Sequence, residues 1–289
     1  MKKIAIACKR SPEGAGRFSP AFKSVYRYLK RKGKEIVLEK PAAEILHLRH
    51  YNEFVRGKTR VDLILVMGGD GTILSVLRQM RKFNVPIFGI NVGTLGFLSE
   101  IQPKAIGKAL DQIFAGDYTI DRRPMIHVEV LRGRSVVQKL HALNEAVISH
   151  GSLARLIKLK TTVDQRKLTT YHADGLIVAT PTGSTAYSLS AGGPILYPSL
   201  GALILTPICP HSFTQKPIVI PDSKTIDIVI ESQSRGISLT VDGQESVPLE
   251  YGDRVRIGRD GVAQFVRLPT ESFFATLREK LDWGKETEK

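Results

Sequence analysis

The chain has 289 residues, of which 42% are hydrophobic and 24% are charged, and its mean hydropathy is -0.06. This composition is that of a globular protein and excludes a disordered or fibrous chain. The length lies where one large hydrophobic core competes with two smaller ones, and we expect two domains. The formal net charge of +14 favours anionic partners, but residues 1–60 alone carry 16 Lys and Arg against 5 Asp and Glu.

The two cysteines, Cys8 and Cys209, give neither a metal-binding spacing nor a disulfide framework, so a reducing compartment fits best. The first apolar run ends at Lys9 and Arg10, which is too early for a signal peptide. The apolar stretch at residues 200–209 contains Gly, Thr and Pro and is too short to span a bilayer. We therefore expect a cytoplasmic protein with no membrane partner.

Up to about residue 120, short apolar runs alternate with amphipathic ones, which is typical of βα units and a mostly parallel sheet. The pattern predicts strands at residues 4–8, 61–67 and 85–90. It predicts helices at residues 21–31, 73–80 and 106–114, the last ended by Gly116.

Beyond residue 120 the hydrophobic period changes to two, as in the alternating apolar residues of 126–130, 226–230 and 237–241. Residues 270–289 return to a helical pattern. We expect an α/β, Rossmann-like N-terminal domain at residues 1–120, with the helical tail 270–289 packed back on it. Residues 121–269 are expected to form an all-β C-terminal domain.

The first candidate site is the run Gly68-Gly69-Asp70-Gly71-Thr72, which lies between a predicted strand and a predicted helix. Its glycines allow a sharp turn and a close approach to a ligand, and the following helix N-terminus favours a phosphate. Simple helix capping by Asp70 or Thr72 is the alternative, but capping requires no flanking glycines. The run is neither a Walker A loop nor a complete GxGxxG motif.

A second glycine-bearing loop, residues 91–98, follows the next predicted strand. Loops at the same edge of a parallel sheet line one cleft. Within this loop Phe97 could stack on a purine, although filling the core is the commoner fate of a lone Phe.

Asn144 and Glu145 interrupt an apolar strand pattern. A carboxylate accepts hydrogen bonds from both ribose hydroxyls, while an amide both donates and accepts, so the pair could hold a ribose. A turn or a sheet-edge pair explains these two residues equally well.

The longest candidate segment runs from Asp174 to Pro194. It contains a buried strand pattern ending at Ala179, a run of small hydroxyl residues and glycine, and a Gly-Gly-Pro stop. Small side chains allow a flat ligand to lie against the backbone, and the apolar residues within the run argue against a flexible loop. By contrast, Asp242-Gly243 reads as an ordinary hairpin turn.

In this order, the Gly68–Thr72 run, the Asn144-Glu145 pair and the Asp174–Pro194 segment resemble the NAD kinase family over roughly residues 61–270. The resemblance implies transfer of the terminal phosphoryl group of ATP to the adenosine ribose 2'-hydroxyl of NAD, giving NADP. It also implies a divalent metal ion, Mg²⁺ or Mn²⁺, on the donor phosphates, and a homotetramer or homodimer. Polyphosphate remains an alternative donor to ATP.

The resemblance also implies roles for single residues. Asp70 would be the proton acceptor, beside Gly71, and Asn144 and Glu145 would hold adenosine. The implied dinucleotide-binding set further comprises Gly68, Gly69, Thr72, Phe97, Arg155, His172, Asp174, Ala179, Thr185, Ala186, Tyr187, Ser188, Leu189, Ser190 and Gln244. His172 stands where many bacterial members carry arginine, which leaves the preference between NAD and NADH open.

Three other classes of protein share part of this pattern. A lipid kinase of the diacylglycerol or sphingosine type shares the first motif but does not need the Asp174–Pro194 segment. A non-catalytic dinucleotide sensor has no use for Asp70. A nucleic-acid binder would explain the net charge, yet the basic N-terminal region lacks a recognisable module, and we expect no nucleic-acid partner. A further hypothesis is that Lys9, Arg10 and Arg17 attract the phosphoryl donor.

Overall fold

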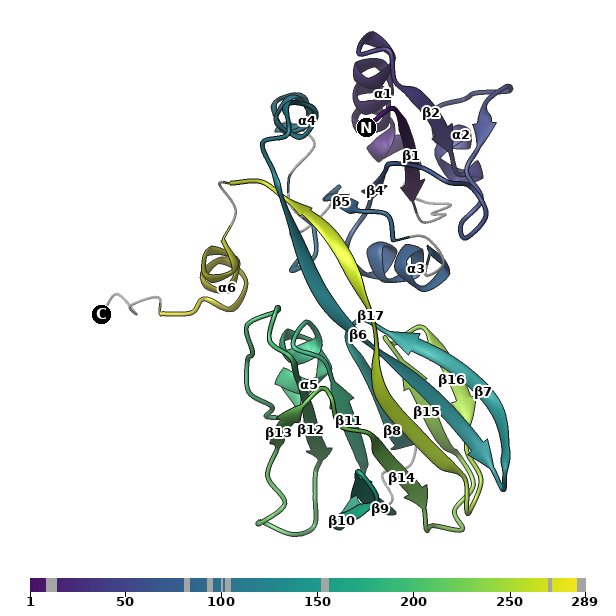
Figure 1. The fold of residues 1–289 in the computed structure, drawn as a ribbon, viewed down its shortest axis with the longest axis vertical. Helices are drawn as coiled ribbons and strands as arrows, with labels where there is room; N and C mark the ends of the chain where they lie inside the picture. Colours follow the sequence, from purple (N-terminus) through teal and green to yellow (C-terminus); the bar gives the residue numbers. More distant parts are fainter. Residues whose placement is uncertain are drawn as a thin grey trace. The chain divides into compact units, whose positions relative to one another are not determined.

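The computed structural model describes residues 1–8, 15–80, 84–92, 96–99, 101, 105–151, 156–269 and 272–284. The chain divides into two compact units, unit 1 of residues 1–121 and 264–289 and unit 2 of residues 122–263. Two long strands, β6 (Thr119–Arg132) and β17 (Arg254–Arg267), each begin in one unit and end in the other (Figure 1). Unit 2 is thus an insertion within the chain of unit 1.

Unit 1 is built on a parallel sheet with the order β3-β2-β1-β4-β5. The strands are β1 (Lys3–Cys8), β2 (Glu35–Leu38), β3 (Asn52–Glu53), β4 (Leu63–Met67) and β5 (Ile87–Ile90). Phe265 of β17 continues the sheet by pairing in parallel with Ile87. The strands β1, β4 and β5 fall on the three predicted apolar runs, although β1 begins one residue earlier and β4 and β5 two residues later than predicted; β2 and β3 were not predicted.

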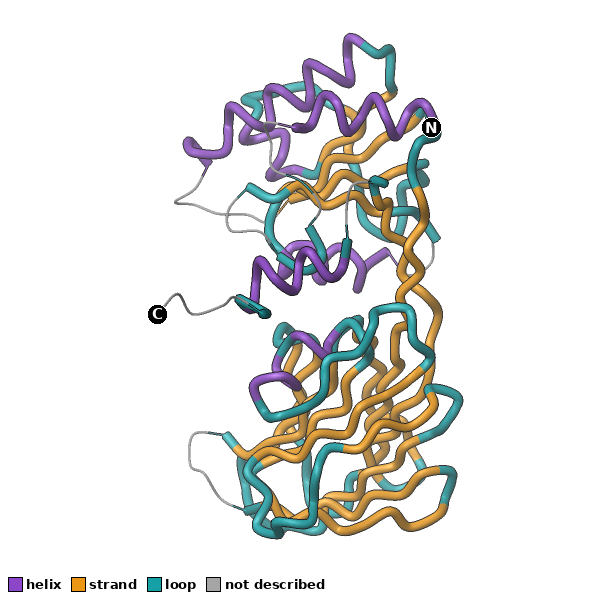
Figure 2. Tube along the Cα trace, turned by 90° about the vertical axis from the view of Figure 1, so that its left-hand side faces the viewer, coloured by secondary structure: helices purple, strands orange, loops and turns teal. Residues whose placement is uncertain are grey.

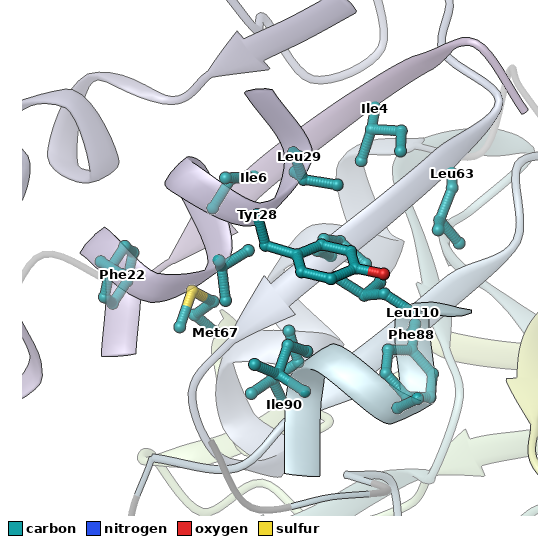
Figure 3. Close-up of a cluster of buried hydrophobic side chains, with 14 of the residues drawn as sticks. Ile4, Ile6, Phe22, Tyr28, Leu29, Leu63, Met67, Phe88, Ile90 and Leu110 are labelled. Atoms are coloured by element: carbon teal, nitrogen blue, oxygen red, sulfur yellow. The ribbon is translucent and has the colours of Figure 1, made fainter. Parts of the chain in front are cut away.

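Helices cover both faces of this sheet (Figure 2). α1 (Ala15–Arg31), α2 (Lys40–Ile45) and α4 (Ile106–Ala115) bury their apolar residues against one face. Part of that core is shown in Figure 3, with residues from α1, α4 and three strands. α3 (Asp70–Met80) packs on the other face, because a Cβ atom placed on Gly89 of β5 would lie 2.8 Å from the Cδ1 atom of Ile73.

Two helices of unit 1 begin earlier than predicted, and a third ends as predicted. α1 begins six residues before the predicted start, and α3 begins at Asp70, inside the glycine run. α4 ends where predicted, because Gly116 adopts a left-handed conformation with φ of 86°. The tail contributes α6 (Phe273–Leu281). No helix in the described part of the chain is long and apolar enough to cross a membrane.

Unit 2 is a β-sandwich. One antiparallel sheet has the order β13-β12-β11-β8-β15-β16, and the other joins β10, β9, β14 and β17, with β6 paired to β17 and β7 paired to β6. The main apolar core of unit 2 draws side chains from both sheets. The remaining strands are β7 (Ser135–Ala142), β8 (Glu145–His150), β9 (Ile157–Val163), β10 (Arg166–Ala173), β11 (Gly175–Ala179), β12 (Ala202–Ile208), β13 (Ile218–Pro221), β14 (Ile226–Ile230), β15 (Ile237–Val241) and β16 (Glu245–Pro248).

A short helical segment covers the outer face of the six-stranded sheet. It consists of the 3₁₀ turn η2 (Gly183–Thr185) and α5 (Tyr187–Ser190). A second small core, made by Val147, Ile177, Ala179 and Ile204, lies on that face with Leu196 packed against it. The predicted fold class, an α/β domain with an all-β domain and a helical tail, is confirmed.

Candidate functional site

In unit 1 the candidate site is the turn between β4 and α3. The amide of Gly68 donates to the carbonyl of Ile90 on the neighbouring strand at 3.0 Å. A side chain at Gly68 would place its Cβ atom 2.4 Å from the Thr72 hydroxyl, whereas a Cβ atom at Gly69 would meet nothing within 4 Å. The turn is therefore tightly closed at its first glycine and open at its second, where the N-terminus of α3 offers its positive dipole end to an anion.

Asp70, the first residue of α3, is held by the neighbouring loop. Its Oδ2 atom accepts a hydrogen bond from the amide of Phe97 at 2.7 Å, and its Oδ1 atom accepts one from the amide of Leu98 at 3.2 Å. Each carboxylate oxygen keeps a second lone pair, so two backbone donors orient the group without exhausting its capacity to accept. The side chain is partly exposed and can meet a ligand.

Gly96 makes the close approach of this loop possible. A Cβ atom at Gly96 would lie 1.8 Å from the Oδ1 atom of Asp70, so no other residue fits without movement. The amide of Gly96 donates to the Ser99 hydroxyl at 3.1 Å, and Ser99 is buried. The two predicted glycine loops are thus brought together around one carboxylate. Phe97 is half-buried, and residues 93–95 lie outside the described residues.

A buried ion pair supports the same region of unit 1 and was not predicted. Arg56 forms a bidentate pair with the carboxylate of Glu39, and its other terminal nitrogen donates to the Ser75 hydroxyl of α3 at 2.9 Å. Glu39 also accepts from the amide of Cys8 at the end of β1. Burial, and then the Glu39 charge, raise the pKa of the Cys8 thiol to about 12, so the thiol stays protonated near neutral pH.

In unit 2 the candidate site begins at the first residue of β8. Because side chains alternate along a strand, Glu145 lies on the same outer face of the sheet as Val147, under the segment that contains η2 and α5. Its strand neighbour on β11 is Ala179. Glu145 is only 5% exposed, and its Oε2 atom has no hydrogen-bond partner among the described residues. A buried carboxylate oxygen without a partner is rare in a folded protein.

Asp242 holds the backbone around this residue. Its carboxylate accepts three amide hydrogen bonds, from Leu143 at 3.0 Å, Asn144 at 2.8 Å and Glu145 at 3.1 Å. The sequence identified only the turn, which exists as predicted, with φ of 49° at Asp242 and 62° at Gly243. The second role could not be read from the sequence, because the three amides lie about a hundred residues earlier in the chain.

Burial, and then the charge of Asp242, raise the pKa of Glu145 from 4.5 to about 8. The folded protein therefore holds a proton on Glu145 at pH values where the unfolded chain has lost it. Folding takes up this proton between about pH 4.5 and pH 8, so the contribution of Glu145 to stability falls as the pH rises through that window.

The hydroxyl-rich turn after β11 packs directly on the Asn144 backbone. The amide of Thr180 donates to the carbonyl of Asn144 at 2.8 Å, and the Thr180 hydroxyl donates to the carbonyl of Leu143. A Cβ atom at Gly183 would lie 2.2 Å from the Asn144 carbonyl oxygen. The structure thus brings together three sequence-predicted elements of unit 2: the Asn144-Glu145 pair, Ala179 and the start of the hydroxyl-rich run.

Some of the remaining side chains of that run are buried, and others are exposed to solvent. Ser188 is fully buried, and its hydroxyl is 2.9 Å from that of Thr206. Thr185 donates to the carbonyl of Thr182 at 3.3 Å. The side chains open to solvent include Tyr187, which is 47% exposed, and Ser190, while Ala186 and Leu189 are partly buried.

The other predicted residues of unit 2 lie at the ends of strands. Asp174 joins β10 to β11, and its carbonyl accepts from the amide of His150 at 3.3 Å. His172 is exposed near the end of β10, and Gln244 is exposed in the turn before β16. Arg155 falls outside the described residues, as do Lys9 and Arg10.

The described residues contain no group of three or more His, Cys, Asp or Glu side chains placed to hold a metal ion. At the glycine turn Asp70 supplies a single carboxylate. Mg²⁺ commonly binds through one or two carboxylates together with substrate phosphates and water, so this donor set fits an ion carried on a phosphate ligand.

Comparisons with known proteins match both units. The sequence model of the ATP-NAD kinase N-terminal domain matches residues 19–118, and that of the ATP-NAD kinase C-terminal domain matches residues 143–267. The NAD kinase of Geotalea daltonii is 40% identical over 287 residues, covering 99% of this chain and all of the relative. The NAD kinase of Syntrophotalea carbinolica is 39% identical over 289 residues, with the same coverage.

Two solved structures have the same fold. A yeast NADH kinase complexed with NADH aligns with a TM-score of 0.89 at 27% identity, covering 99% of this chain and 89% of its own. An NAD kinase from Archaeoglobus fulgidus in complex with ATP aligns with a TM-score of 0.74 at 29% identity, covering 97% and 98%.

Proposed function

We propose a mechanism that proceeds from one premise: the chain belongs to the NAD kinase family, as both domain matches and the full-length relatives show. The protein is an enzyme that phosphorylates NAD to NADP, a phosphotransferase with an alcohol group as acceptor. Lipid phosphorylation and non-catalytic sensing find no support among these relatives. The proposal concerns the residues that perform the reaction and the partners that they require.

Asp70 orients the 2'-hydroxyl of the adenosine ribose and accepts its proton. The hydroxyl oxygen forms a bond to the terminal phosphorus of ATP, the bond from that phosphorus to the bridging oxygen breaks, and ADP leaves. Phosphoryl transfer has a loose transition state, so positioning contributes more than proton abstraction. The observation that carries this role is the pair of amide hydrogen bonds from Phe97 and Leu98, which hold the Asp70 carboxylate in one orientation.

The glycine turn, Gly68 to Thr72, receives the donor phosphates. Open space at Gly69 and the N-terminus of α3 support this assignment, and the Archaeoglobus relative binds ATP. Neutralisation of the donor's negative charge is the chemistry that a divalent metal ion, Mg²⁺ or Mn²⁺, supplies when it is bound.

Unit 2 binds the dinucleotide. Asn144 and Glu145 hold the adenosine ribose, and the unpartnered oxygen of Glu145 supports this role because a ribose hydroxyl would satisfy it. Further contacts come from Phe97 in unit 1 and, in unit 2, from Arg155, His172, Asp174, Ala179, Thr185, Ala186, Tyr187, Ser188, Leu189, Ser190 and Gln244. The yeast relative binds NADH, so both NAD and NADH are acceptors to test.

We assign the dinucleotide-binding role to residues 121–269 and the donor role to residues 1–120 with the tail. Phe213, 90% exposed, and the exposed residues Ile218 and Val219 of edge strand β13 support assembly into a homodimer or homotetramer. The free thiols of Cys8 and Cys209 support a cytoplasmic location.

The test is NADP formation by the purified enzyme with NAD, ATP and Mg²⁺, compared with the Asp70→Asn variant. We expect wild-type turnover and a kcat lowered ~10²- to 10⁴-fold in the variant, in the range of general acid–base effects. Parallel reactions replace ATP by polyphosphate, NAD by NADH, or NAD by diacylglycerol. Near-normal turnover by a folded Asp70→Asn variant would remove Asp70 from the mechanism, and failure of the wild type to make NADP would overturn the donor and acceptor assignments.

A further inference from the structure

The first helix of unit 1 carries charge of one sign only. Residues 15–34, which comprise α1 and the turn after it, contain seven Lys and Arg and no Asp or Glu. Its buried face is apolar, with Phe22, Val25 and Leu29 at most 1% exposed. The basic residues therefore have to lie on the outer side of the helix.

Part of this outer side forms a depression of about 420 Å³ lined by Ser24, Arg27, Lys30 and Arg31. Arg27, Lys30 and Arg31 follow Ser24 by three, six and seven residues, so the four side chains lie on one face of the helix. Three cations and a hydroxyl line the depression, and no acidic side chain is among the described residues that line it.

The three cations have no carboxylate partner among the described residues. The adjacent Lys32, by contrast, pairs with Asp111 at 2.7 Å. The Nε atom of Arg27 donates to the carbonyl of Lys23 at 3.2 Å, which anchors the guanidinium and leaves its terminal nitrogens for a ligand. Like charges three or four residues apart on a helix repel one another and destabilise it, so a bound anion would reduce this repulsion.

Aromatic rings hold two of these cations in place. The Lys30 ammonium lies 5.1 Å from the centre of the Tyr26 ring, and the Arg31 guanidinium lies 5.9 Å from that of Tyr28. A solvated helix face is the simplest alternative, since cations in a last turn favour the helix dipole. That alternative accounts for Lys30 and Arg31, but it accounts neither for Arg27 nor for the depression.

The dimensions and charges of the depression indicate which kind of anion it can bind. Seven residues of helix span only ~10 Å, too short for the many phosphate contacts that hold a nucleic acid. Burial of the apolar face of α1 prevents its insertion into a membrane surface. Two arginines one turn apart suit a compact group of several phosphates, because each guanidinium binds phosphate oxygens in pairs.

We propose that the depression lined by Ser24, Arg27, Lys30 and Arg31 binds a polyphosphate group, either inorganic triphosphate or the triphosphate of a nucleotide. It shares no residue with the Gly68–Thr72 turn and is a second anion site of unit 1. It does not depend on the proposed mechanism, because none of its residues takes part in the reaction.

The experiment is calorimetric titration of the full chain with sodium tripolyphosphate at constant ionic strength. The test variant is Arg27→Gln/Arg31→Gln. The control is Arg134→Gln/Arg235→Gln, which removes the same charge from exposed positions of unit 2. We expect the test variant to lose one class of binding sites, with affinity reduced at least ~10-fold, and to keep its thermal midpoint and kcat for NADP formation. The control should titrate like the wild type.

Separate titrations with ATP and adenosine identify the source of the group. Loss of a class of sites in the test variant for both ATP and tripolyphosphate, but not for adenosine, indicates recognition of phosphates alone, and loss for ATP only indicates a nucleotide. Equal titrations of the wild type and the test variant with both tripolyphosphate and ATP would overturn the proposal, as would a short DNA duplex that binds this face when neither of these ligands does. Failure of the proposed mechanism is distinguishable, because it abolishes NADP formation and leaves this titration unchanged.

Discussion

Replacement of Gly96 by alanine tests the arrangement around Asp70 directly. The added Cβ atom would lie 1.8 Å from the Oδ1 atom of Asp70, and real Cβ contacts are essentially never shorter than 3.0 Å. Either the carboxylate or the loop must therefore shift by at least about 1.2 Å. Either movement weakens the amide hydrogen bonds from Phe97 and Leu98 that orient the carboxylate.

A misplacement of ~1 Å at a reacting group costs about 10²-fold in rate, which corresponds to ~2.7 kcal/mol of activation free energy. We expect Gly96→Ala to lower kcat by about this factor in initial-rate assays of NADP formation. Gly107→Ala is the matched control, because its Cβ atom would lie 3.8 Å from the Tyr28 ring, an ordinary contact, and it should retain wild-type kinetics.

A double-mutant cycle distinguishes this effect from a general loss of loop structure. Asp70→Ala removes the atoms that the new Cβ atom would strike, so adding Gly96→Ala to it should lower the residual rate by less than ~3-fold. Additive losses in the cycle, or near-wild-type kcat for Gly96→Ala with an unchanged thermal midpoint, would refute the proposed contact.

Three further variants test the stability of each unit by urea unfolding. Glu145→Gln cannot titrate, so its free energy of unfolding should vary less between pH 5 and pH 8 than that of the wild type and should exceed it at pH 8 by up to ~5 kcal/mol; parallel pH profiles would contradict the raised pKa of Glu145. Asp242→Asn places an amide NH₂ group against at least one of the three backbone amides that Asp242 accepts, and it should destabilise the protein by about 2–4 kcal/mol. A loss below ~0.5 kcal/mol would argue against these three hydrogen bonds. Arg56→Met leaves the buried Glu39 carboxylate without its cation and should lower the free energy of unfolding by about 3–5 kcal/mol; a loss of ~1 kcal/mol or less, as for an exposed ion pair, would contradict a stabilising role of this pair.

Local pattern was enough to predict the architecture of the fold. The strand β4 and all of β1 after Lys3 are uninterrupted apolar runs, and α4 has a clear helical period that ends at Gly116, so the hydrophobic pattern and one left-handed glycine identify them. β2 and β3 have only four and two residues, too few to show a period, and they are held by pairing with β1 and with each other.

Of the candidate site, only the local sequence motifs could be predicted. Glycine spacing identifies the turn at Asp70, but not that its carboxylate is bound by amides 27 and 28 residues later in the chain. Asp242 shows the same limit, because an Asp-Gly turn has the same sequence whether or not its carboxylate clamps another strand. Such roles depend on tertiary proximity, which composition and period do not encode.

The insertion of unit 2 into unit 1 has a consequence for synthesis of the protein. The sheet that carries the glycine turn is completed by Phe265, which pairs beside Ile87, so residues 122–263 must leave the ribosome before unit 1 can close. At a synthesis rate of about 5–20 residues per second, the edge of β5 in the nascent chain stays without Phe265 for on the order of 10 s. A chain released before residue 265 therefore leaves the edge of the apolar strand β5 without Phe265 beside it, and an exposed apolar edge makes truncated products prone to aggregation.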